Sequence, residues 1–406
     1  MLFSSVHGVG NLKKKYKYKC KNKYNNFLLN GGVKMKINCQ TNELINALNV
    51  VFKTASSKTT MPILEGVLIE AYNNEIKLTT NDLEMGCTHT MICNVQEEGS
   101  TVVDIKMLNE IMRRLEAEQI TIESDDKLFV IKSINGIFKL AVMDPLEYPK
   151  LPVFTINNNI EIKQRIFKDM IRKILFAIST DENRPVYTGA LLKVEDNILT
   201  LVALDGFRLA LKKYLNETEI NNFKAIIPGR VLSEILKILT DNDEEVIKIG
   251  TNRNQALFEV GNSVIISRII DGEFLNYNSI IPSDKETRIR VKTKKILDAF
   301  ERVALFAKES SDRDKKSPVK MNISLDGLTL SCISQTGDAK ESIPAVLEGK
   351  DIEIGFNPRY FIETLKVLED QEIYIDFTSN IAPAVIYPLQ GNDYLYIVLP
   401  VKLRQE

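Results

Sequence analysis

The sequence predicts an α+β protein that consists of three copies of one domain. The main observation is a ten-residue pattern that occurs three times, at residues 106–115, 230–239 and 359–368. In each copy the first and eighth residues are basic, the fifth is glutamate, and the third, seventh and tenth are apolar. Self-similarity at corresponding places along a chain is the signature of repeated structural units.

The repeated segment has the spacing of an amphipathic helix. At about 100° per residue, positions one, five and eight lie on one face, and positions three, seven and ten lie on another face that can be buried. A second helix, with apolar residues at helical spacing, is expected before each copy. These upstream helices are predicted at residues 44–52, 170–178 and 296–306.

Strands connect the two helices of each unit in the same order. Each upstream helix leads through a polar loop to a proline and a strand, at residues 62–69, 185–192 and 318–323. A strand, a turn and a further strand follow, at residues 78–85, 201–209 and 330–338. Each unit ends with a hairpin-like pair of strands and a proline, at Pro152, Pro282 and Pro400. We expect domains at residues 35–157, 158–282 and 283–406.

The composition is that of a globular protein. Hydrophobic residues make up 44% of the chain and charged residues 26%, and no apolar run approaches the roughly 20 residues of a membrane span. The five cysteines are odd in number and form no Cys-x-x-Cys motif, so neither a disulfide framework nor a zinc site is expected. A reducing, cytoplasmic compartment fits best.

Residues 1–34 lie outside the repeat. They contain eight lysines and no acidic residue, and removing these eight charges from the formal net charge of −1 leaves −9 for the remainder. The segment could be a basic arm that binds nucleic acid, a targeting segment, or an extension upstream of a true start at Met35. We favour the last interpretation, because Gly31 and Gly32 can be encoded by a purine-rich ribosome-binding stretch, and we expect residues 1–34 to be unstructured.

Basic residues gather on the repeated helix faces of this acidic body. The pattern supplies Lys106, Arg113, Arg230, Lys237, Arg359 and Lys366, and the upstream helices add Lys168, Arg172, Lys295 and Arg302. For any single helix, a solvated face with weak ion pairs is the simpler explanation. Basic residues instead recur at equivalent positions in all three units, which indicates that the helices line one common surface. That surface suits phosphate groups and lacks a base-reading motif, so sequence-independent binding to nucleic acid is expected.

The sequence gives little support for catalysis. Its histidines are His7, in the N-terminal extension, and His89, in an alternating strand segment where a structural role is the simpler explanation. Asp82, Glu84 and Asp205 lie near turns, where acidic side chains usually make local hydrogen bonds. The chain contains no Walker loop, nucleophile elbow or metal-binding cluster. We therefore expect a protein that is not an enzyme and that needs no cofactor or metal.

Motifs from all three units resemble one family, in the family's order and spacing. They are residues 61–64 (Met-Pro-Ile-Leu), 80–85 (Thr-Asn-Asp-Leu-Glu-Met), 204–210 (Leu-Asp-Gly-Phe-Arg-Leu-Ala), 271–274 (Asp-Gly-Glu-Phe) and 396–401 (Tyr-Ile-Val-Leu-Pro-Val). From Met35 to about residue 403, the chain is similar to the bacterial DNA sliding clamp, the beta subunit of DNA polymerase III.

The resemblance implies a processivity factor of DNA replication. Each protomer would have three domains, each with two helices inside and two sheets outside, and two protomers would join head to tail into a ring around duplex DNA. By resemblance, Lys58 and Arg184 lie at the ring face near the DNA. The protomers would meet through four residues, Phe138 and Leu140 of one and Leu305 and Phe306 of the other.

The resemblance also implies a shallow apolar pocket between the second and third domains. In the family, this pocket takes a short peptide from the replicative polymerase, the clamp loader and repair proteins. The matching positions are Tyr187, Leu204, Gly206, Phe207, Arg208, Leu209, Leu275, Tyr277, Ile280, Asn357, Tyr360, Ile397, Val398, Leu399 and Val401.

Three expectations about this pocket can be tested against a structure. Arg208 is expected to bond peptide carbonyls. Removal of the chain from Ile397 onward removes one wall of the pocket, so the truncated protein is expected to dimerise but to fail to stimulate polymerase. Phe207 and Ser279 depart from residues found in some members, and residues 404–406 extend the C-terminus, so peptide preference is expected to differ.

Two other classes of protein remain open from the residues alone. An enzyme with a pocket between domains would require a pair of strongly perturbed carboxylates. A monomeric three-repeat scaffold would bind peptides without encircling DNA. Molar mass in solution separates the scaffold from a clamp, because a 46.1-kDa chain that closes a ring behaves as a dimer.

Overall fold

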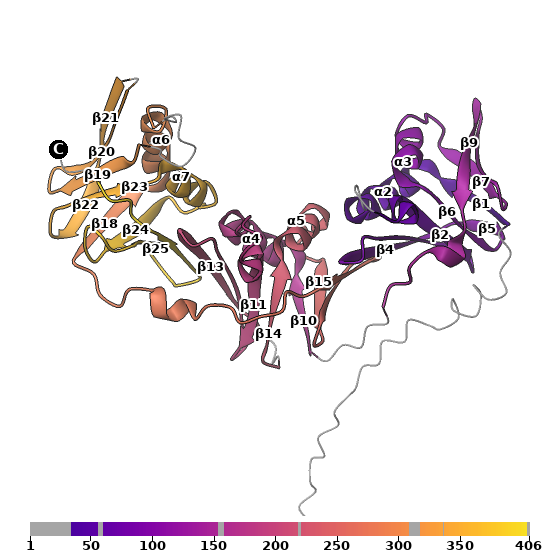
Figure 1. Ribbon diagram of the computed structural model, residues 1–406, viewed down its shortest axis with the longest axis horizontal. Coiled ribbons are helices and arrows are strands. Elements are labelled where there is room, and N and C mark those ends of the chain that lie inside the picture. Colours follow the sequence, from indigo (N-terminus) through magenta and orange to yellow (C-terminus); the bar gives the residue numbers. More distant parts are fainter. Residues whose placement is uncertain are drawn as a thin grey trace, which may run out of the picture.

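The computed structural model describes residues 34–55, 60–152, 158–217, 221–307, 317–335 and 337–403. Three domains follow one another in an arc, with their helices on the concave side and their sheets on the convex side (Figure 1). The described ranges contain six α-helices, two in each domain. None of these helices is long and apolar enough to cross a membrane. The predicted α+β class and three-fold repetition are therefore confirmed.

The ten-residue pattern forms a helix in every domain. The three helices are α3 (Ile105–Arg113), α5 (Gly229–Ile238) and α7 (Pro358–Lys366). The upstream helices are α2 (Thr41–Val51), α4 (Gln164–Ile174) and α6 (Thr293–Val303). All three upstream helices begin and end earlier than predicted. The predicted ends were too late because apolar residues continue past the last helical turn, and 3-10 turns follow α2 at Phe52–Thr54 and α4 at Leu175–Ala177.

The strands fall into three successive groups along the chain, one in each domain. The first domain has β1 (Met35–Gln40), β2 (Gly66–Tyr72), β3 (Glu75–Asn81), β4 (Met85–Ile92), β5 (Asn94–Glu97), β6 (Gly99–Asp104), β7 (Gln119–Ser124), β8 (Leu128–Ser133) and β9 (Gly136–Met143). The second has β10 (Asn158–Lys163), β11 (Gly189–Glu195), β12 (Ile198–Leu204), β13 (Arg208–Leu215), β14 (Phe223–Pro228), β15 (Val246–Thr251), β16 (Gln255–Val260) and β17 (Ser263–Arg268). The third has β18 (Thr287–Lys292), β19 (Val319–Ser324), β20 (Gly327–Ser334), β21 (Gly337–Ile343), β22 (Ala345–Gly349), β23 (Ile352–Phe356), β24 (Glu372–Phe377), β25 (Ala384–Pro388) and β26 (Tyr394–Val398).

The buried apolar side chains of α3, α5 and α7 determine which side of each helix faces the sheets. The third-position residues Leu108, Leu232 and Phe361 are fully buried, so each helix packs its apolar face against the sheets. Two of the helices also have a side-chain N-cap: Asp104 accepts a hydrogen bond from the backbone N–H of Met107, and Asn357 caps the start of α7. Such caps satisfy backbone donors that the first turn leaves free.

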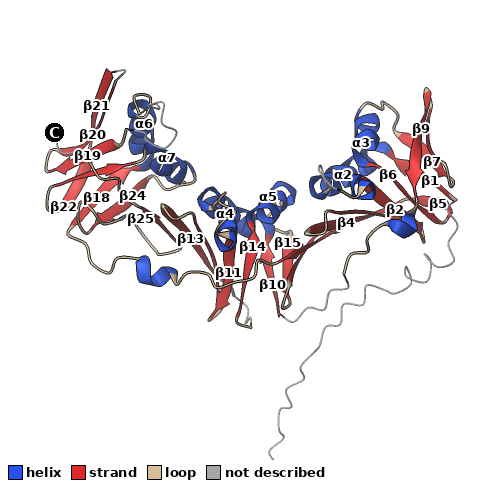
Figure 2. Cartoon of the chain, in the orientation of Figure 1, coloured by secondary structure: helices blue, strands red, loops and turns tan. Residues whose placement is uncertain are grey.

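Two sheets cross the boundaries between domains. A thirteen-stranded sheet joins the first and second domains where β17 pairs with β4, and a nine-stranded sheet joins the second and third where β13 pairs with β26. Both junctions are antiparallel ladders of backbone hydrogen bonds. The arc is therefore held by continuous sheets and not only by the connecting segments (Figure 2).

The two ends of the arc expose strand edges. At one end, β21 is the outermost strand of a four-stranded sheet. At the other end, β9 pairs with β8 along its length but with β6 only at Val142 and Met143. Unpaired backbone groups on such edges are templates for pairing with another chain.

Candidate nucleic-acid interface and partner pocket

The concave side of the arc carries the basic residues of the repeat. Because α3, α5 and α7 bury their apolar faces against the sheets, their opposite faces point to the concave side (Figure 2). The first- and eighth-position side chains are all exposed there: Lys106, Arg113, Arg230, Lys237, Arg359 and Lys366. The structure thus brings together six of the predicted DNA-facing residues.

The glutamate of each repeat takes a different partner. Glu234 pairs with Lys237 at 2.8 Å, and Glu363 pairs with Arg359 at 2.8 Å, both within their own pattern. Glu110 instead pairs with Arg114, the ninth residue of its segment, which is not one of the repeated basic positions. The glutamates therefore reduce the positive charge of α5 and α7 more directly than that of α3.

Two cations of α4 also have acidic partners. Lys168 Nζ lies 2.7 Å from Asp241 Oδ2. Arg172 contacts Asp169 at 3.2 Å and also pairs with Glu369, which follows α7 in the third domain. Exposed pairs of this kind contribute at most about 1 kcal/mol, so a phosphate group can replace the acid as the partner.

The remaining predicted DNA-facing residues have different surroundings. Arg302 pairs with Glu341 of β21 at 2.9 Å (Nε to Oε2), and Lys295 is exposed on α6. Arg184 is exposed just before the 3-10 turn Pro185–Thr188 that leads into β11. Lys58 lies outside the described residues.

Polar contacts cross the first interdomain boundary as well. Arg230 of α5 pairs with Asp82 of the first domain at 2.6 Å. Lys53 Nζ donates a hydrogen bond to the backbone oxygen of Lys237 at 3.1 Å, and burial lowers the pKa of Lys53. Sequence reasoning missed Lys53, because it lies outside the repeated pattern and only the fold brings it to α5.

Two aromatic residues form one wall of the predicted pocket. Phe207, which is 57% exposed, stacks on Tyr360 of α7 with ring centroids 5.6 Å apart and an interplanar angle of 16°. Gly206 precedes Phe207 with a φ of 92°, a conformation that residues with a Cβ rarely adopt. The turn therefore projects Phe207 from the second domain onto the third.

Arg208 lies behind this wall and is only 6% exposed. Its guanidinium is sandwiched between the rings of Phe176 and Tyr360, 5.0 and 4.9 Å from their centroids. Nε donates to Asp205 at 2.9 Å, one terminal nitrogen donates to Glu363 at 2.5 Å, and the other donates to the Phe176 carbonyl at 2.5 Å. Three of the five N–H donors of Arg208 thus have acceptors within the protein, and the expectation that Arg208 bonds peptide carbonyls stays a prediction.

The apolar members of the predicted pocket separate into a floor and a rim. Leu204, Leu209, Tyr277 and Ile397 are buried in one cluster, with Tyr187 packed against it. The rim residues are 37–40% exposed: Leu275, Ile280, Leu399 and Val401. The rim can thus contact an apolar ligand while the floor supports it.

Two expectations about the C-terminal strand are corrected. Val398 is fully buried in the main core, because alternation along β26 directs it to the face opposite Ile397. It does not line the pocket. Removal of the chain from Ile397 onward would also cut β26, which lies between β13 and β25 in the nine-stranded sheet, so the truncation would disrupt the junction of two domains and not the pocket alone.

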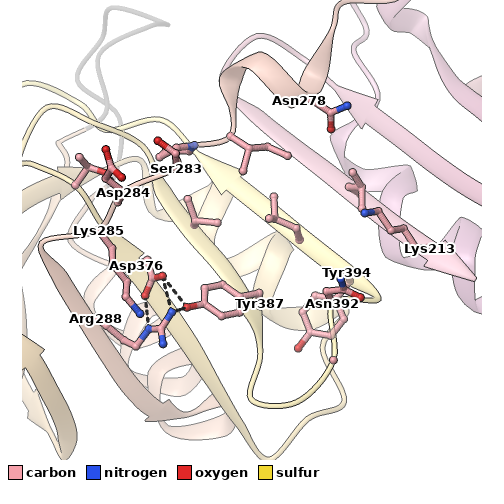
Figure 3. Close-up of a pocket in the computed structure, with 17 residues that line it drawn as sticks. Lys213, Asn278, Ser283, Asp284, Lys285, Arg288, Asp376, Tyr387, Asn392 and Tyr394 are labelled. Atoms are coloured by element: carbon pink, nitrogen blue, oxygen red, sulfur yellow. Dashed lines mark hydrogen bonds and ion pairs between the residues drawn. The ribbon is translucent and has the colours of Figure 1, made fainter.

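A cavity of about 530 Å³ lies next to this site, beneath the segment that connects the second and third domains (Figure 3). It shares no residue with the predicted pocket. Arg288 donates two hydrogen bonds to Asp376, at 2.7 and 2.9 Å, and the Tyr387 hydroxyl donates to Asp376 at 2.6 Å. Because Arg288 neutralises Asp376, this cavity does not offer the paired carboxylates that an enzyme would require.

The shifted acidic pKa values likewise report ion pairs and hydrogen bonds. They are lowered at Glu123, Asp125, Asp241, Glu341 and Glu363. Burial alone would raise the pKa of Glu363, but hydrogen bonds from Arg359 and Arg208 lower it. A general acid would instead need a raised pKa.

His89 has a structural position. Its Nδ1 lies 2.8 Å from Ser263 Oγ across the junction of β4 and β17, and burial lowers its pKa. In the described part of the chain, no group of three or more His, Cys, Asp or Glu side chains could hold a metal ion.

Fold and surface together define a three-domain clamp protein with basic helices on its concave side. Family models of the DNA polymerase III beta subunit match its N-terminal domain at residues 35–152, its central domain at residues 161–276 and its C-terminal domain at residues 278–402. The chain belongs to this family, the beta sliding clamps, which are non-catalytic processivity factors in DNA replication. The predicted family, fold and non-enzymatic function are confirmed.

Named relatives match over nearly their whole length. The beta sliding clamp of Bacillus subtilis is 34% identical over 91% of this chain and 100% of its own. That of Halalkalibacterium halodurans is 34% identical over 88% of this chain and 97% of its own. The crystal structure of the DNA polymerase sliding clamp from Bacillus subtilis has a TM-score of 0.87 at 33% identity, covering 91% of this chain and all of its own.

Proposed function

We propose that two copies of this chain close head to tail into a ring that encircles duplex DNA in the cytoplasm and binds partner proteins at the pocket between its second and third domains. The observation that carries the proposal is the arc itself. Its ends expose strand edges, and its concave side collects basic helices. If the first-domain end of one copy contacts the third-domain end of another, a two-fold axis repeats this contact and closes the two arcs into a ring.

Apolar side chains at both ends support this closure. Phe138 is partly exposed on β9, and Leu305 is 63% exposed after α6. Leu140 and Phe306 are half-buried against their own core. Phe306 also lies beside Gly337, at the start of the β21 edge strand.

Sequence reasoning missed two further apolar residues at these ends. Ile137 on β9 and Ile333 near the β20–β21 turn are 63% and 67% exposed. The signal in the sequence was their place in alternating strands, which did not show that they lie at the ends of the arc.

The concave surface suits a protein that slides. Most of its cations are exposed, and several already have an acidic partner. A phosphate group therefore finds no site of strong binding along this surface. Contact with the sugar-phosphate backbone alone gives sequence-independent, salt-sensitive attachment. Topological enclosure would then retain the ring on DNA.

The pocket suits a short apolar peptide. Leu275, Ile280 and Leu399 are partly exposed around a buried floor, and the Phe207–Tyr360 stack forms a rigid wall. We propose that peptides of the replicative polymerase, the clamp loader and repair proteins bind there in turn. A shallow site of this kind supports micromolar affinity, about −8 kcal/mol.

The decisive experiment measures retention on DNA circles. A dimer of the 46.1-kDa chain, loaded onto closed circular DNA, is expected to stay bound at high salt until a nuclease linearises the circle. Binding to linear duplex should fall steeply with salt, since it rests on phosphate contacts. A monomeric mass in solution, or release from circles without linearisation, would refute the ring.

A further inference from the structure

Helix α7 presents neighbouring residues to two different surfaces. Arg359 is exposed on the concave side, and Tyr360, the next residue, forms the pocket wall with Phe207. One helical turn further along, Glu363 contacts an arginine of each surface, Arg359 on the concave side and Arg208 behind the pocket wall. It accepts a hydrogen bond from Arg359 Nε at 2.8 Å and another from Arg208 at 2.5 Å.

Arg208 is fixed, whereas Arg359 is free to move. The Arg208 side chain is buried, and Asp205 and the Phe176 carbonyl hold it from the second domain. The Arg359 side chain is exposed, with Glu363 as its carboxylate partner. Two guanidinium groups bond to Glu363. Only that of Arg359 can move to another anion without breaking contacts between the second and third domains.

The Glu363 carboxylate, which pairs with both Arg208 and Arg359, determines how a change at one arginine affects the other. Two cations on one carboxylate divide its charge and its lone pairs, so removing one strengthens the pair with the other. A DNA phosphate that draws Arg359 away leaves Glu363 to Arg208. The stronger Arg208–Glu363 pair then holds α7, and with it Tyr360, more firmly against Phe207.

We propose that Glu363 couples the two surfaces, so that the clamp binds partner peptides more tightly when duplex DNA occupies its concave side. This inference rests on the proposed function of the pocket. Because coupling between two binding sites is reciprocal, bound peptide raises the affinity for DNA by the same factor. Arg359 and Glu363 are partly exposed to solvent, so we expect a coupling of about threefold, below the usual five- to 150-fold range.

The test measures peptide affinity by fluorescence anisotropy, with and without excess short duplex DNA at low salt. The probe is a fluorescein-labelled peptide rich in Gln, Leu and Phe, the type of ligand that the family resemblance implies. In the unaltered protein, DNA is expected to tighten peptide binding about threefold. Arg359→Ala frees Glu363 permanently, so the variant without DNA should already show the tighter affinity, and DNA should add nothing. Glu363→Gln should bind the peptide more weakly and equally with or without DNA.

Lys106→Ala is the matched control, because Lys106 occupies the same first position on α3, far from the pocket. It also loses one DNA-facing charge, yet the DNA-dependent tightening should persist at saturating DNA. Circular dichroism melting confirms that each variant is folded. The coupling alone would be overturned if the unaltered protein bound the peptide equally with and without DNA, or if DNA still tightened peptide binding in Arg359→Ala. If the folded protein did not bind the peptide at all, both the pocket and the coupling would be overturned.

Discussion

Charging the third-domain end of the arc should separate the ring into monomers. The change is the double substitution Leu305→Lys and Phe306→Lys. Leu305 is 63% exposed in the single chain and Phe306 is half-buried, so closure of the proposed ring would cover most of their remaining apolar surface. Neither side chain is fully buried in its own domain, and the variant should therefore fold.

The size of the effect follows from the area still open. Full burial of a leucine or phenylalanine side chain contributes about 1.5–3 kcal/mol, so covering these partly exposed residues contributes about 2–3 kcal/mol in each interface. A two-fold ring has two such interfaces, which gives about 4–6 kcal/mol or a 10³- to 10⁴-fold rise in the dimer dissociation constant. Desolvation of two lysines adds to this loss.

Sedimentation equilibrium gives the dissociation constant directly. Leu215→Lys is the matched control, because Leu215 is 68% exposed in the second domain, away from both ends of the arc. The control should remain dimeric, while the double variant should sediment as a folded monomer of 46.1 kDa. A double variant that stays dimeric at the control's affinity would show that the third-domain end does not form the interface.

Three further outcomes are expected. Replacing Phe207 and Leu399 by alanine should weaken peptide binding about 10- to 100-fold without changing the dimer, since large-to-small changes at apolar contacts cost about 1–3 kcal/mol; unchanged binding in a fluorescence titration would place the pocket elsewhere. Replacing Lys106 and Arg113 by alanine should lower the slope of log affinity against log salt by at most about 1.8, as each phosphate contact contributes about 0.9; an unaltered slope would mean that these residues do not contact DNA. The pKa of Glu363 is lowered from its usual 4.5, so its ion pairs stabilise the folded state above that pH and lose this effect as the pH falls through the folded pKa. The gap in melting temperature between the unaltered protein and Glu363→Gln should therefore close in acid, and a gap that is constant with pH would contradict this account.

The sequence predicted features that depend on local periodicity. Helices α3, α5 and α7 were predicted because burial of an apolar face such as that of Phe361 imposes a helical period on nearby residues. The side on which Val398 lies depends on the register of β26 with β13, which no local pattern reveals. The partners of Arg208 are also distant in sequence: Glu363 lies 155 residues away and Phe176 lies 32 residues away. Only the packing of two domains shows that three N–H groups of this arginine already have acceptors within the protein.

The sheets that run through the domain boundaries determine where the proposed ring is mechanically weak. Within one chain, both junctions consist of strand ladders, β17 with β4 and β13 with β26, and each requires several backbone hydrogen bonds to break together. The contact between chains would also join two strand edges, but the chain does not run through it, so no connecting segment reinforces it. Each protomer would therefore be stiff along its length, and the proposed ring would deform most easily where two protomers meet. A force applied anywhere on the ring would travel through the stiff arcs and open the ring at a seam between protomers.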